Sequence, residues 1–186
     1  MRFFTPQLYL RFNSKHDEEA LAADEEWERA ITQYNEHLNS LRSKMPIQVA
    51  RLTETCLHDA DVLLRREHQQ PFMLPSRPEW SPFGALVPWY GIFALAVQQD
   101  EQVLAIFYFL ADHVTEEPPI RGWMFSGGPE QWLYDEIDYR AAAGGHFVHN
   151  VLLSTGVLLS IPFSNVLMER FPVTLIQKKK RSKKAV

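Results

Sequence analysis

The sequence predicts an α+β fold in which N-terminal helices pack on a meandering antiparallel β-sheet of five or six strands. Apolar residues recur at helical spacing in the first part of the chain, whereas short runs rich in β-branched and aromatic residues fill the rest. The chain has 186 residues, 46% of them hydrophobic, which suffices for one domain with its own core. We therefore expect a single domain over 1–177, with a helical part at about 1–58 and a sheet part at about 59–170.

Two helices are expected before residue 45. The first spans 6–12, because the Thr5 hydroxyl can cap it and Pro6 suits the first helical position, where no N–H is needed. Ser14 offers a cap for the second, long helix over 16–44. Apolar residues spaced alternately by four and three residues indicate that the long helix packs one face on the domain. They are Trp27, Ile31, Tyr34, Leu38, Leu41 and Met45.

A shorter helix is expected after Pro46, which breaks the long one. Its apolar side consists of Ile47, Val49, Leu52, Cys56 and Leu57. On that side Cys56 is expected to be a small core residue, because no cationic neighbour is evident that would activate its thiol. A single cysteine also excludes an intramolecular disulfide framework and a multi-thiolate zinc site.

The sheet part consists of apolar runs separated by turns and by two longer loops. The loop at 69–90 holds five of the twelve prolines and should wrap the domain, with Phe72, Trp80 and Phe83 as anchors. A second loop is expected at 115–129. Glycines at 144–145 and at 156 supply hairpin turns. The expected strands are 61–67, 91–97, 103–111, 130–140, 146–154 and 157–163.

One strand pair carries a candidate acid–base couple. If Arg140 pairs opposite His146, odd-numbered positions share one apolar face, and Asp135 and His149 lie on it as diagonal neighbours within about 7–8 Å. The two could form a general acid–base couple or a structural polar pair, and the structural interpretation is favoured because no nucleophile is evident. The other odd positions are Leu133, Ile137, Tyr139, Phe147, Val151 and Leu153; Glu136 and Asp138 should face solvent.

The second candidate is the run His58-Asp59-Ala60-Asp61. The adjacent His-Asp pair resembles the metal-dependent phosphohydrolases named for that dipeptide, but the resemblance covers two residues. A histidine at the C-terminal end of a helix also interacts favourably with the helix dipole, and this structural interpretation is preferred. The aromatic residues Trp80, Trp89, Tyr90 and Trp123 could line a ligand pocket, although pinning of loops to the domain is favoured. No catalytic residue, metal or cofactor is therefore assigned.

Charge is concentrated at the end of the chain. Six of the 19 basic residues lie in 178–186, which we expect to be a disordered basic tail. The remaining 177 residues carry 13 basic and 23 acidic side chains, a net charge of about −10, which makes nucleic-acid binding improbable except through the tail. No apolar run reaches bilayer length, so no membrane segment is expected. The basic residues of the tail are Lys178, Lys179, Lys180, Arg181, Lys183 and Lys184.

Several motifs together resemble one bacterial family whose members carry a domain of unknown function. They are the opening MRFFTPQLYLRFNS, the Trp27 helix, Leu57-His58-Asp59-Ala60, Tyr134-Asp135-Glu136, and Phe147-x-His149-x-x-Leu152-Leu153-Ser154. The resemblance implies a soluble bacterial protein and brings no activity or ligand. The expected function is a non-catalytic cytoplasmic module that binds another protein or a second copy of itself, for which loop aromatics are suited. The alternative is a small metal-dependent hydrolase that uses the His58/Asp59 region or the Asp135–His149 pair.

Overall fold

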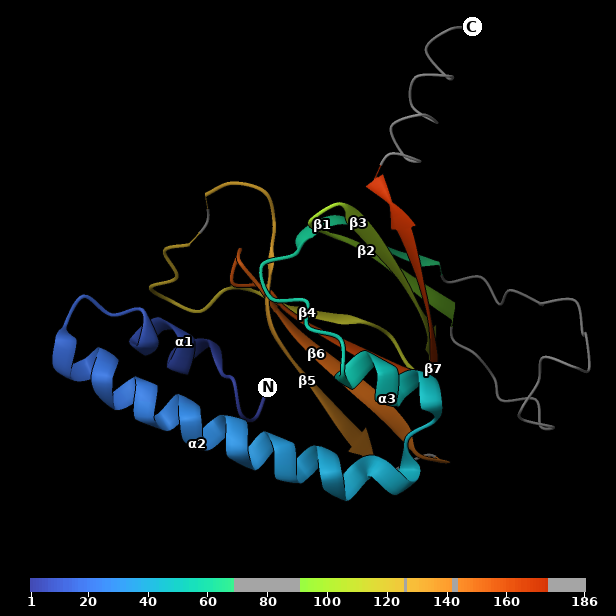
Figure 1. Cartoon of the computed structure of the whole chain (residues 1–186), viewed down its shortest axis with the longest axis horizontal. Helices are drawn as coiled ribbons and strands as arrows, with labels where there is room; N and C mark the ends of the chain where they lie inside the picture. The colour runs from blue at the N-terminus through green and yellow to red at the C-terminus, as the bar shows by residue number, and fades with distance from the viewer. Residues whose placement is uncertain (69–90, 126, 142–143, 174–186) are drawn as a thin grey trace, which may run out of the picture.

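The computed structural model describes residues 1–68, 91–125, 127–141 and 144–173, and they form an α+β fold (Figure 1). Three helices come first: α1 (Pro6–Phe12), α2 (Asp17–Leu41) and α3 (Ile47–Thr53), with a 3-10 turn, η1 (Arg42–Lys44), extending α2. Thr5 caps α1 by accepting a hydrogen bond from Leu8 N, and Pro6 is its first residue, as predicted.

The strands form one antiparallel sheet in the order β1-β2-β3-β7-β6-β5, and β4 pairs with β7 beside this path. The sheet curls until its two ends meet, because Asp61 of β1 bridges to Gln131 beside β5. Arg65 of β1 reinforces this closure through Glu130, at 3.2 Å, and Glu116, at 2.9 Å. The strands are β1 (Asp61–His68), β2 (Gly91–Gln99), β3 (Gln102–Leu110), β4 (Thr115–Glu117), β5 (Trp132–Arg140), β6 (His146–Leu153) and β7 (Leu158–Pro172).

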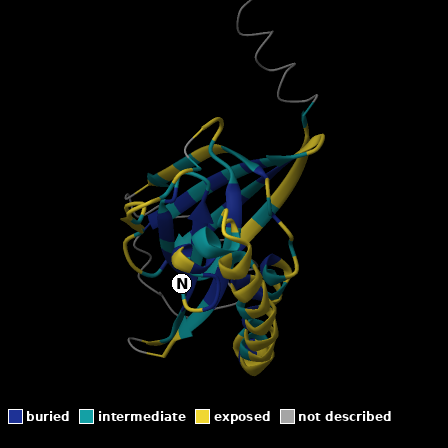
Figure 2. Ribbon diagram, turned by 90° about the vertical axis from the view of Figure 1, so that its left-hand side faces the viewer, coloured by how far each residue is buried: buried dark blue, intermediate teal, exposed yellow. Residues whose placement is uncertain are grey.

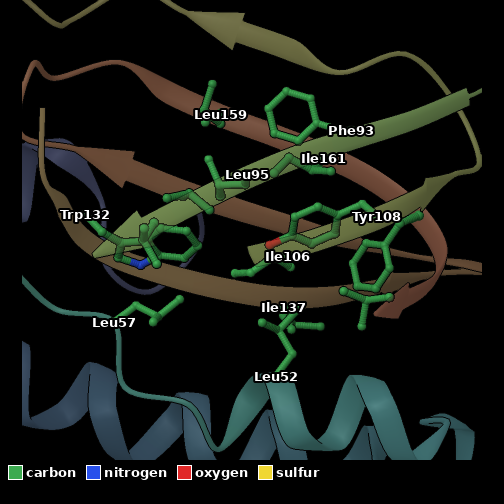
Figure 3. Close-up of a cluster of buried hydrophobic side chains, with 14 of the residues drawn as sticks. Leu52, Leu57, Phe93, Leu95, Ile106, Tyr108, Trp132, Ile137, Leu159 and Ile161 are labelled. Atoms are coloured by element: carbon green, nitrogen blue, oxygen red, sulfur yellow. The ribbon is translucent and has the colours of Figure 1, made fainter. Parts of the chain in front are cut away.

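The larger core lies on the concave face of the curled sheet (Figure 3). Side chains from opposite strands, such as Phe93 and Tyr108 of β2 and β3 and Ile161 of β7, meet there, and Leu52 of α3 and Leu57 close one side. Burial of this apolar surface provides the main driving force for folding. Figure 2 shows that burial is concentrated in the strands, while the outer side of α2 is exposed.

A second cluster joins α1 and α2 to the convex side of β5. Trp27 of α2 packs edge-on against Tyr134 of β5, with ring centroids 4.4 Å apart, and Phe4 packs on both rings. The other members are Phe3, Leu8, Ala23 and Ala30. The long helix thus covers one face of the sheet, as predicted, but the larger core is inside the curl rather than under the helix.

The prediction that Glu136 faces solvent is wrong. Its carboxylate is 3% exposed and accepts backbone hydrogen bonds from Arg2 and Phe3, at 2.7 Å each, and from Phe4, at 2.5 Å. Glu136 does lie on the convex face, away from the main core, but the N-terminal segment covers that face. Asp138, on the same face, is half exposed and lies 3.1 Å from the His37 ring.

Several predicted helix positions also differ. Ile31 and Ile47 are exposed, because the buried side of α2 follows Ala23, Trp27, Ala30 and Leu41 instead. Cys56 is exposed as well, because α3 ends at Thr53 and the apolar side of this helix does not extend to residue 56. Ser14 accepts from His16 N but does not cap α2, whose N-cap is His16.

The strand predictions are right in number for the main path but not in all bounds. β4 lies within the predicted 115–129 loop, and β7 continues nine residues beyond 163, pairing first with β6 and then with β3. Ser164 is absorbed as a bulge, so the polar Ser164-Asn165 pair does not end the strand. A second bulge in β5 places Trp132, rather than Leu133, among the main-core residues. The predictions for 69–90 and for the tail lie outside the described residues.

Candidate functional site

The register on which the expected Asp135–His149 contact depends is present, since Arg140 pairs with His146. Ile137 lies opposite His149, and Asp135 is its diagonal neighbour on the concave face. The two side chains meet, with His149 Nε2 2.9 Å from Asp135 Oδ2. Strand parity therefore brings this pair together as expected.

His149 belongs to a buried polar network of four side chains. Its Nδ1 lies 2.9 Å from the Tyr108 hydroxyl, and Trp132 Nε1 donates to Asp135 Oδ1 at 3.0 Å. Because an ionised carboxylate can only accept, His149 Nε2–H donates to Asp135 and the Tyr108 hydroxyl donates to Nδ1. Burial, and then the charge of Asp135, raise the pKa of Tyr108 well above its usual value, which keeps this phenol protonated. Since His149 is fully buried and both ring nitrogens are bonded, no ring atom remains to meet a substrate.

The other predicted candidates lie on the surface where the chain enters β1. His58 Nδ1 is 2.9 Å from Asp59 Oδ2, and Asp59 takes a left-handed backbone conformation with φ 62°. Asp61 does not join them, because it accepts a hydrogen bond from the Gln131 amide at 3.1 Å. Among the described residues, no group of three or more histidine, cysteine, aspartate or glutamate side chains is placed to hold a metal ion.

A half-exposed aromatic cluster adjoins His58 and Asp59, and we call it the aromatic platform: Tyr9, Trp123, Phe125 and Tyr134. Tyr9 of α1 stacks on Trp123, with centroids 5.5 Å apart and ring planes inclined by 24°, and Phe125 stands edge-on to both rings. Tyr134 of β5 contacts both Tyr9 and His58 and so connects the platform to His58. The ring centroids of Tyr134 and His58 are 4.8 Å apart. In Figure 1 the loop after β4 runs beside α1.

Trp123 is held from behind by the β6–β7 turn. Its indole nitrogen donates to Ser154 O at 2.9 Å, and its ring lies against Gly156. A Cβ on Gly156 would stand 2.6 Å from the ring and 2.7 Å from Pro119, so only glycine allows this approach; its φ of +82° requires glycine too. Contacts within the protein therefore fix the position of the Trp123 ring. Of the aromatic residues suggested as pocket lining, Trp80, Trp89 and Tyr90 lie outside the described residues.

Two open hollows lie elsewhere on the described surface. One, of about 250 Å³, lies between the N-terminal segment and β5 and is lined by Arg2, His37, Glu136, Asp138 and Arg140 among others. Its charges are mixed in sign, and its Glu136 carboxylate is already occupied by backbone N–H groups. The other, of about 400 Å³, lies between α3 and β7. Neither includes the platform.

Sequence reasoning found His58, Asp59 and Trp123 as separate features but did not connect them, and it missed Tyr9, Phe125 and Tyr134. Tyr9 lies in a predicted helix and Tyr134 in a predicted strand, more than 120 residues apart. No spacing rule relates such positions. The even parity of Tyr134, opposite to that of Asp135, was the one available signal that it points outward.

The comparisons with protein families, with curated proteins and with solved structures gave no match. The resemblance to the bacterial family of unknown function therefore stays a prediction. In the part of the chain that the structure describes, no helix combines the length and the apolar character needed to cross a membrane.

Proposed function

We propose that this protein is a non-catalytic binding module that contacts another protein through the aromatic platform. The observation that carries the proposal is that four aromatic side chains from α1, the 118–130 loop and β5 form one half-exposed surface. Aromatic residues are enriched at protein interfaces because they bury a large area with little loss of side-chain freedom. The resemblance to the bacterial family implies a soluble bacterial protein, and the proposal places this module in the cytoplasm.

The rigidity of the platform supports a binding role. Trp123 is fixed by its hydrogen bond to Ser154 O and by its contact with Gly156, and Tyr134 is packed against Trp27. A surface that is already ordered loses less conformational entropy when a partner binds. Met124, between Trp123 and Phe125, is 72% exposed and adds an adaptable apolar side chain at the same place.

The test is site-specific photo-crosslinking in cells that carry the gene. A photoreactive residue at Met124 should give one discrete adduct, and Trp123→Ala should abolish it. A photoreactive residue at Ile47, which is 62% exposed on α3, is the matched control and should give none. Light scattering of the purified protein shows whether the adduct is a second copy. Equal crosslinking from both positions, or none from Met124, would contradict the proposal.

A small hydrolase is the second candidate, and one observation favours it. The Asp59 carboxylate holds His58 at Nδ1, while Nε2 has no hydrogen-bond partner among the described residues. An imidazole oriented in this way can act as a general base. The test is an esterase and phosphatase screen of the purified protein, with elemental analysis for bound metal. Turnover that His58→Gln abolishes would support this candidate over the binding module.

A further inference from the structure

Three polar atoms beside the aromatic platform have no hydrogen-bond partner among the described residues. Within the described residues, the hydroxyls of Tyr9 and Tyr134 make no hydrogen bond, and neither does Oδ1 of Asp59, a residue whose side chain is 67% exposed. The negative charge of Asp59 acts on both phenols. After burial, it is a cause of the raised pKa of Tyr9, and it contributes, after burial and Tyr9, to the raised pKa of Tyr134. Aromatic rings and an open carboxylate therefore share one surface.

We propose that the platform and Asp59 bind an arginine guanidinium of the partner, which stacks on an aromatic face and pairs with the carboxylate. This inference rests on the proposed function. A guanidinium is planar and weakly hydrated, so it can lie on a ring by cation–π contact while its N–H groups reach a carboxylate at the edge. The free phenol hydroxyls can accept further N–H groups.

The packing of the rings selects this cation over a quaternary ammonium. A trimethylammonium group needs a cage of separated rings, whereas Tyr9, Trp123 and Phe125 are in mutual contact, with centroids 5.3–5.5 Å apart. A flat cation requires one open face and one acceptor, which this surface offers. A lysine ammonium is more strongly hydrated and cannot stack, so it should bind more weakly.

Charge complementarity over the whole molecule supports the same partner. The full chain carries a net charge of −4, and residues 1–177 alone about −10, so the field of the protein attracts a basic surface and repels an acidic one. The His58–Asp59 contact leaves the carboxylate able to pair with a guanidinium, because it uses Oδ2 of Asp59 and leaves Oδ1 open. An arginine-bearing peptide surface is attracted by the net negative charge at long range and pairs with the Asp59 carboxylate on contact.

The experiment is an NMR titration of the full chain that follows the indole N–H signal of Trp123. N-acetyl-arginine amide is the probe, the citrulline analogue is its neutral isostere, and tetramethylammonium tests for a free quaternary cation, all at one ionic strength. We expect saturable shifts with the arginine probe at millimolar concentration and much smaller ones with the other two. Asp59→Asn should weaken binding by about 3- to 5-fold, as expected for an exposed charge pair.

The Asp59→Asn variant is conservative for the backbone, because asparagine also tolerates the left-handed conformation of residue 59. Glu117→Gln, an exposed carboxylate on β4, is the matched control and should leave binding unchanged. Equal shifts with citrulline or tetramethylammonium, unchanged binding by Asp59→Asn, or no shift at all would overturn the inference. If the Met124 crosslink forms while the arginine probe fails, this inference is wrong and the binding module stands.

Discussion

Replacing Glu136 by glutamine should release the N-terminal segment from the sheet. Oε1 of Glu136 accepts the N–H groups of Phe3 and Phe4, and Oε2 accepts that of Arg2. Glutamine keeps one oxygen, so its amide group would point donor to donor at one backbone N–H. The change removes no volume. It therefore isolates the electrostatic contribution of a buried carboxylate to the attachment of α1.

The magnitude follows from the three bonds. A hydrogen bond to a charged group contributes about 1.5–3 kcal/mol and a neutral one about 1 kcal/mol. Glutamine loses one charged bond, at about 1.5–3 kcal/mol, and weakens two others by about 0.5–2 kcal/mol each, so the free energy of unfolding should fall by about 2.5–7 kcal/mol. Urea unfolding measures this difference, and hydrogen exchange should show faster exchange of the Phe3 and Phe4 amides.

The matched control is Glu117→Gln, which changes an exposed carboxylate that lines the same hollow. It should alter the free energy of unfolding by less than about 0.5 kcal/mol. If Glu136→Gln were equally neutral and the amides of Phe3 and Phe4 stayed protected, the carboxylate would not hold the segment, and its burial would need another explanation.

Three further changes test other contacts. His149→Phe keeps an aromatic ring but leaves the Tyr108 hydroxyl and Asp135 Oδ2 without a partner. The free energy of unfolding measured in urea should fall by about 2–4 kcal/mol, and a fall below about 0.5 kcal/mol would refute the network. Gly156→Ala should cost about 1–3 kcal/mol and shift the Trp123 indole signal, whereas Gly127→Ala, with no atom within 4 Å of the new Cβ, should do neither; equal effects would show that Gly156 does not set the ring. Cys56 should react fully with a thiol reagent in the folded protein, and protection until denaturant is added would place it in the core instead.

The sequence predicted the parts of the fold that depend on local periodicity. The bounds of α1 follow from a cap and a proline, and strict alternation puts Asp135 and His149 on one face once Arg140 is paired with His146; all of these features are local. The β7 strand was cut short at residue 163 because a bulge looks like a strand end when its partner strand is unknown. The β4 strand has three exposed residues and carries no apolar signal.

Glu136 shows why burial on the convex face could not be predicted. Its even parity was interpreted as solvent exposure, which is correct for a sheet with one covered face. The N-terminal segment covers the second face, and its backbone N–H groups supply the partners that a buried carboxylate needs. Backbone donors leave no pattern in an amino-acid sequence.

The two His–Asp pairs that the sequence singles out, Asp135–His149 and His58–Asp59, have the same composition, and their surroundings give them different capacities. Asp135–His149 lies on the concave face, where Tyr108 and Trp132 satisfy its remaining atoms and the His149 ring is fully buried. His58–Asp59 lies at a turn with a left-handed residue, which directs the carboxylate outward beside Tyr9 and Tyr134. Buried polar groups that are fully bonded specify a fold, whereas exposed groups with open atoms can recognise a ligand. The surface pair and its aromatic platform are therefore where binding by this protein is to be sought.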